Sequence, residues 1–132
     1  MQKLSSDGVD ILNNCIDQCE KCITACQDLI DKCSVNNGPE CAQAVGACVK
    51  QNNFCIDACS KTIDWCNAQL IVDEKNRHLY KTCIESCQNC IDQCENTTEQ
   101  CRTGHEECIE ICLQCIKLCT EAAKACDALL EQ

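Results

Sequence analysis

Cysteine thiols recur at a helical spacing along the whole chain, and they are the residues whose chemistry the sequence indicates most clearly. In 108–126 the cysteines stand at offsets 0, 4, 7, 11 and 18, and the same offsets recur in 15–33 and 83–101. A fourth block, 41–66, has offsets 0, 7, 14, 18 and 25. Residues three, four and seven apart share one face of an α-helix. Each block therefore predicts a helix with five thiols along a single stripe.

These four blocks contain all 20 cysteines, and each cysteine falls at position a or d of a heptad. In a helical bundle these positions face the central axis. The candidate metal ligands are Cys15, Cys19, Cys22, Cys26, Cys33, Cys41, Cys48, Cys55, Cys59, Cys66, Cys83, Cys87, Cys90, Cys94, Cys101, Cys108, Cys112, Cys115, Cys119 and Cys126.

Thiolate ligands favour soft metal ions, and Cu(I) is the ion that we expect this set of thiols to bind. Zinc needs four ligands in a tetrahedron, so one cysteine per helix at each level would bind about five ions. Cu(I) is satisfied by two or three thiolates, and bridging thiolates would allow about one ion per cysteine, on the order of 20. No Lys or Arg occupies an a or d position to balance excess thiolate charge. A zinc or mixed soft-metal buffer is the alternative.

Two other uses of cysteine are less favoured. Cβ atoms three or four residues apart on a helix are about 5–6 Å apart, whereas a disulfide needs about 3.5–4.5 Å. Helix geometry does not exclude disulfides between facing helices. Thiol catalysis needs neighbouring groups that activate the cysteine, and the sequence offers few of them. There are only two histidines, and the Cys-x-x-Cys pairs lie inside long helical series. We therefore expect no enzymatic activity.

Four helices must position the stripes, and the predicted fold is one all-α domain over 1–132. Helices are expected at about 6–35, 39–70, 73–102 and 104–130. Ser5 or Ser6, Pro39 and Asp73 are the predicted start signals of the first three, and Thr103 with Glu106 forms a capping box for the fourth. Short connections between long helices predict an antiparallel up-down four-helix bundle with cysteines lining the core.

The positions beside the cysteines complete the predicted core. Position e is mostly aliphatic, as in Ile16, Ile56 and Ile116, which predicts packing between neighbouring helices. Tyr80 at position a should fill one end of the bundle. The polar residues that interrupt the stripes are expected to be spacers or hydrogen-bonding fillers, and they are Asn52, Thr62 and Thr97.

Composition and charge narrow the partners. The net charge of −10 disfavours nucleic acid and anionic membranes. No apolar run is long enough to span a bilayer, and the first residues show no apolar signal region. We expect a cytoplasmic protein, because thiols persist in a reducing compartment. Its expected partners are copper ions and copper chaperones or small chelating thiols.

The two histidines differ in their heptad positions. His105 falls at a, three residues before Cys108, so we expect it to bind metal or to admit it at that end of the bundle. His78 falls at f, where a solvent-exposed side chain is expected.

The helical Cys-x-x-x-Cys-x-x-Cys-x-x-x-Cys pattern, with His78-Leu79-Tyr80-Lys81 leading to Cys83, resembles the bacterial copper storage proteins over essentially the whole chain. The resemblance implies a four-helix bundle whose cysteines bind many Cu(I) ions, and the cytosolic branch of that family. It also implies a homotetramer and a histidine-lined entrance at one end of the bundle.

Overall fold

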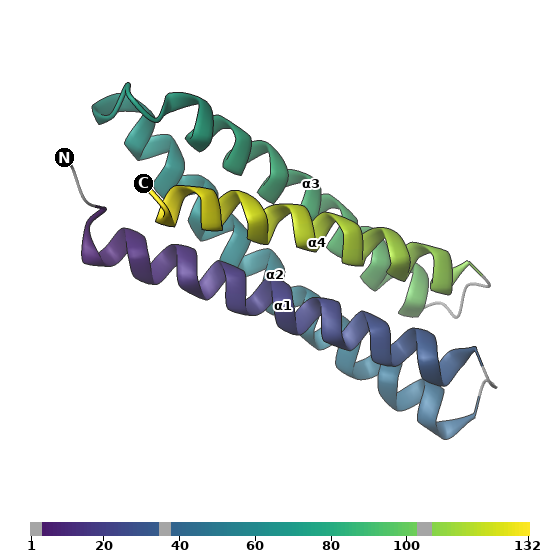
Figure 1. The fold of residues 1–132 in the computed structure, drawn as a ribbon. Helices are drawn as coiled ribbons and strands as arrows, with labels where there is room; N and C mark the ends of the chain where they lie inside the picture. Colours follow the sequence, from purple (N-terminus) through teal and green to yellow (C-terminus); the bar gives the residue numbers. More distant parts are fainter. Residues whose placement is uncertain (1–3, 35–37, 103–106) are drawn as a thin grey trace.

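Four long α-helices form an antiparallel up-down bundle in the computed structural model of the chain (Figure 1). They are α1 (Ser6–Cys33), α2 (Pro39–Val72), α3 (Arg77–Arg102) and α4 (Cys108–Leu130). The structure describes residues 4–34, 38–102 and 107–132, without the side chain of residue 102. Within these residues each helix packs on two neighbours, which leaves α1 diagonal to α3 and α2 diagonal to α4. This confirms the all-α fold and the bundle topology.

The two ends of the bundle are built differently. Both chain termini and the α2–α3 connection lie at one end, which we call the terminal end (Figure 1). The α1–α2 and α3–α4 connections lie at the opposite end, which we call the loop end.

Local signals fix the starts of the first two helices. Ser5 is the N-cap of α1, and its Oγ accepts a hydrogen bond from the Gly8 N–H at 3.1 Å. Pro39 opens α2, where its missing N–H costs nothing because the first N–H groups of a helix have no internal partner. Both starts agree with the sequence prediction.

The second connection lies further along the chain than predicted. The helix α2 runs on to Val72 and α3 begins at Arg77, so Asp73 is the C-cap of α2 and not the N-cap of α3. Its carboxylate still accepts hydrogen bonds from the Asn76 backbone and side-chain N–H groups at 3.4 and 3.3 Å. These bonds hold residues 73–76 in a turn and delay the start of α3. Thr103 and Glu106, the predicted capping box, lie outside the described residues.

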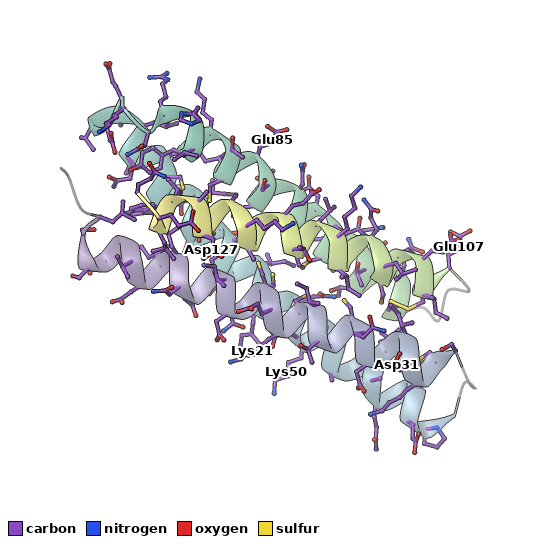
Figure 2. All side chains as sticks on the ribbon, in the orientation of Figure 1. Lys21, Asp31, Lys50, Glu85, Glu107 and Asp127 are labelled. Carbon is purple, nitrogen blue, oxygen red and sulfur yellow. A yellow bond between two sulfur atoms is a disulfide. The ribbon has the colours of Figure 1, made fainter. Side chains whose placement is uncertain are left out.

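Sulfur and a few aliphatic side chains make the core, while charge stays on the surface. Leu12, Leu29 and Leu129 are almost completely buried among the cysteines, and the e-position residues Ile16 and Ile116 pack against them from the flank. The labelled charged side chains in Figure 2 point outward from the helices. Among the described residues no helix has both the length and the apolar character needed to cross a bilayer.

Aromatic packing closes the terminal end. Tyr80 is 1% exposed and meets Trp65 edge to face, with ring centroids 5.8 Å apart. The Tyr80 hydroxyl donates to an Asp73 carboxylate oxygen at 2.9 Å, which ties α3 to the end of α2. The Trp65 indole lies directly over Gly8 of α1. Tyr80 thus fills this end of the bundle, as the heptad pattern predicts.

We predict that Gly8→Ala destabilises the bundle, because a Cβ at Gly8 would overlap the Trp65 ring. The expected loss is about 1–3 kcal/mol in the free energy of unfolding, measured by urea titration of the reduced, metal-free protein. Gly46→Ala is the matched control, since a Cβ there meets nothing within 4 Å. That change should stabilise α2 by about 0.5–1 kcal/mol. A higher free energy of unfolding in both variants would mean that Trp65 does not pack on Gly8.

We also predict a pH-dependent role for Tyr80. Burial and the hydrogen bond to Asp73 raise the pKa of Tyr80 to about 12, against about 10 in an unfolded chain. The unfolded state therefore loses this proton first, and the stability that Tyr80 supplies is complete below about pH 10 and lost as pH rises to about 12. The difference in unfolding free energy between wild type and Tyr80→Phe should shrink over this range. A constant difference would contradict the prediction.

Candidate metal centre

Sixteen cysteine thiols run along the bundle axis and are fully inaccessible to solvent. Each is 0% exposed and carries a free thiol. We call this set the sulfur column: Cys15, Cys19, Cys22, Cys26, Cys48, Cys55, Cys59, Cys66, Cys83, Cys87, Cys90, Cys94, Cys112, Cys115, Cys119 and Cys126. The heptad prediction that these residues face the axis is confirmed.

Sulfur atoms from neighbouring helices lie in van der Waals contact across the column. The contacts between α1 and α2 include Cys19 to Cys55 at 3.7 Å, and those between α3 and α4 include Cys90 to Cys119 at 3.5 Å. Cys55 also reaches Cys90 on α3 at 3.7 Å. The thiols therefore form one connected set and not four separate stripes.

Groups of three or four sulfurs are close enough to bind one metal ion. Two groups have four sulfurs that all lie within 4.8 Å of one another. One combines Cys19, Cys55, Cys59 and Cys90, and the other combines Cys22, Cys55, Cys94 and Cys119. We call these the four-sulfur groups. Cys55 belongs to both, so a metal in each group would share that sulfur as a bridge.

Three-sulfur groups extend the same sharing toward both ends. They include Cys15 with Cys59 and Cys87, Cys22 with Cys26 and Cys115, and Cys26 with Cys48 and Cys112. Because Cys59, Cys22 and Cys26 each occur in more than one group, the candidate sites overlap along the axis. The arrangement can bind several metal ions in a chain of shared thiolates.

The interior supplies no cationic partner for these sulfurs. Among the described residues the buried polar side chains are Asn52, Thr62 and Thr97, and none of them is charged. Buried thiolates without a cation would be strongly destabilised by desolvation. The hydrogen bond between Cys22 and Cys115, together with burial, raises the pKa of Cys22 to about 11, which favours the protonated thiol in the metal-free protein.

Close pairs of thiols share protons. At the Cys26–Cys48 contact of 3.6 Å, hydrogen bonds from Cys112 and Cys26 lower the pKa of Cys48 to about 4. Hydrogen bonds with Cys112, Cys115, Cys22 and Cys48, together with burial, raise the pKa of Cys26. Within this pair the proton is therefore held more tightly by Cys26 than by Cys48.

Asn52 lies within the column as a hydrogen-bonding side chain, in agreement with the sequence prediction. Its Oδ1 accepts hydrogen bonds from the Cys22 and Cys115 thiols at 2.8 and 3.8 Å, and its Nδ2 donates to the Cys48 sulfur at 3.7 Å. Thr62 and Thr97 instead donate to backbone carbonyls within their own helices, as expected of fillers. The signal for Asn52 was present, since an amide at an a position between cysteines has only sulfur within reach.

Four of the 20 predicted ligands are paired in disulfides at the loop end. Cys33 is bonded to Cys41 and Cys101 to Cys108, with Cα–Cα distances of 4.7 and 5.3 Å. These distances fall in the range that a disulfide allows, because each short connection brings two helix ends together. In this form the four residues are not thiolates, so they are not available as ligands while the disulfides persist. For the reduced protein their assignment as ligands stays a prediction.

Only one of the two histidines lies among the described residues. His78 is exposed on α3, as its f position predicts. His105, the predicted ligand or entrance residue, lies outside the described residues.

None of the protein families, curated proteins or solved structures compared with the chain matches it. The family resemblance noted in the sequence therefore stays a hypothesis, and the geometry of the column carries the functional argument.

We predict that Cys55→Ser lowers metal capacity more than Cys66→Ser does. Cys55 is shared by the two four-sulfur groups, whereas Cys66 lies near the terminal end and in neither of them. The expected losses are about two ions for Cys55→Ser and at most about one for Cys66→Ser. Bound metal per protein is measured by elemental analysis after gel filtration, with helix content checked by circular dichroism. Equal losses would show that the sulfurs bind independently.

Proposed function

We propose that this protein is a non-enzymatic reservoir for soft metal ions, and that its cargo is Cu(I) at about one ion per cysteine thiolate. The observation that carries the proposal is the sulfur column itself. Sixteen thiols are fully buried, overlapping groups of three or four sulfurs lie among them, and no charged side chain is buried among the described residues.

Charge balance favours a monovalent cation. Each Cu(I) that displaces one proton leaves the core electrically neutral when every thiolate is shared by two ions. A Zn²⁺ ion at four thiolates would leave a charge of about −2 per site, with no buried Lys or Arg to balance it. In an interior of low dielectric constant such an uncompensated charge is costly.

Sharing of sulfurs favours the same ion. The overlapping groups fit ligands that bridge two metals, and Cu(I) accepts the two or three sulfurs that most groups provide. Separate tetrahedral sites would need separate sets of four, but the two four-sulfur groups compete for Cys55.

Zinc remains the second candidate because of one specific group. Cys22, Cys55, Cys94 and Cys119 provide one sulfur from each of the four helices. A zinc tetrahedron with bonds of about 2.3 Å has sulfur–sulfur edges of about 3.8 Å. The four sulfurs of this group all lie within 4.8 Å of one another, so small side-chain shifts would bring them to that spacing.

The proposal includes a reducing compartment, where the thiols persist and small thiols or chaperones can exchange copper with the protein. A homotetramer is also proposed, on the resemblance described above. The half-exposed Phe54 and Leu113 on the outer faces of α2 and α4 are available to such an interface.

The test is a titration of the fully reduced protein with Cu(I) against a competing chelator, under anaerobic conditions. We expect saturation near 20 ions, one for each cysteine, with about one proton released per ion. Protein that keeps both disulfides should saturate near 16 ions, since 16 thiols are free.

Zn²⁺ in place of Cu(I) is the control, with an expected capacity of about five ions or fewer. Saturation with Cu(I) near five, or displacement of bound Cu(I) by Zn²⁺, would contradict copper storage and favour the zinc alternative.

A further inference from the structure

Solvent reaches cysteine sulfur only at the loop end, within the part of the chain that the structure describes. Cys33, Cys41 and Cys108 are half-buried and Cys101 is 3% exposed, whereas the 16 free thiols are 0% exposed. These four are the residues that form the two disulfides. Among the described cysteines, the oxidised ones are therefore those nearest to solvent.

One of the two disulfides touches the sulfur column. The Cys101 sulfur lies 3.9 Å from the Cys112 sulfur. Cys112 in turn forms a three-sulfur group with Cys26 and Cys48. A line of sulfur atoms therefore runs from half-buried Cys108 through Cys101 and Cys112 into the column.

The other disulfide is set apart from the column. Cys33 and Cys41 are each seven residues, two helical turns, from the nearest column cysteine on their own helices. Leu29 and Ala44 lie between them and the column, with 0% and 4% of their surface exposed. The difference between the two disulfides follows from the cysteine spacing. At the loop end only α4 has two cysteines four residues apart, Cys108 and Cys112, which places a column thiol one turn from a disulfide.

We propose that Cys101–Cys108 is a redox site whose reduction by a small thiol opens the sulfur column to Cu(I) and whose oxidation closes it. The proposal rests on the storage function argued above. In the dithiol form Cys108 and Cys101 are two further Cu(I) ligands that continue the line of sulfurs to the surface. In the disulfide form neither sulfur is a thiolate, so that line begins only at fully buried Cys112.

The reaction is ordinary thiol–disulfide exchange. A small thiolate attacks the more exposed Cys108 sulfur, the Cys101–Cys108 bond breaks, and Cys101 leaves as a thiolate beside Cys112. A second small thiol attacks the mixed disulfide at the small-molecule sulfur and releases Cys108 as a thiol. Two small thiols are oxidised to one disulfide, and two electrons reduce the protein disulfide to two thiols.

The test compares the rate at which Cu(I) is taken from a chelator before and after reduction of the protein with dithiothreitol, which is removed before mixing. For wild type we expect loading about tenfold or more faster after reduction. Cys33→Ser/Cys41→Ser is the matched control, because it removes one disulfide and two thiols from the same end, and it should keep this ratio. In Cys101→Ser/Cys108→Ser the ratio should fall to about one.

Cys108→Ser alone is a second variant, which leaves Cys101 as a free thiol beside Cys112 and should load rapidly under both conditions. Alkylation and mass measurement count the disulfides in every sample.

The outcomes separate the two proposals. The redox gate is wrong, and storage stands, if all samples bind Cu(I) and reduction changes no loading rate. The same conclusion follows if the ratio of loading rates falls to one in Cys33→Ser/Cys41→Ser instead of in Cys101→Ser/Cys108→Ser. If no sample binds Cu(I) in either redox state, storage is wrong and the gate falls with it.

Discussion

Burial of many thiols with no charged partner is the constraint on which this structure depends. A cysteine side chain packs as a small apolar group while it is protonated, so a bundle can bury 16 of them and remain folded. The same side chain becomes a strong ligand when a soft cation replaces its proton. Protonated and metal-bound states are therefore both compatible with an interior that contains no buried charge among the described residues.

The helical lattice turns this constraint into an extended site. Positions a and d advance along the axis in steps of three and four residues, about one turn each. With cysteine at most of these positions on four helices, sulfurs meet across adjacent helices, and those four residues apart, such as Cys90 and Cys94, also meet on one helix. Cys55 illustrates the result, since it contacts Cys19 of α1 and Cys90 of α3 and belongs to both four-sulfur groups.

Different side chains give the two ends of the bundle different properties. At the terminal end Tyr80, Trp65 and Gly8 pack tightly, and the hydrogen bond from Tyr80 to Asp73 fixes the turn above them. At the loop end the sulfurs themselves come within reach of solvent, and there they are found as disulfides. Among the described residues, the cysteines that are not fully buried are thus confined to the loop end.

The sequence by itself determined the helices, their antiparallel order and the inward stripe of cysteines, because a strict three- and four-residue period admits only one buried face. It also located Tyr80 in the core. Only the tertiary structure decided which sulfurs meet, that Cys55 is shared, and that Asn52 bonds to three thiols, because these contacts depend on the relative height of neighbouring helices. The tertiary structure also determined the disulfides. They form where two helix ends converge, and the heptad pattern does not specify the distance between helix ends.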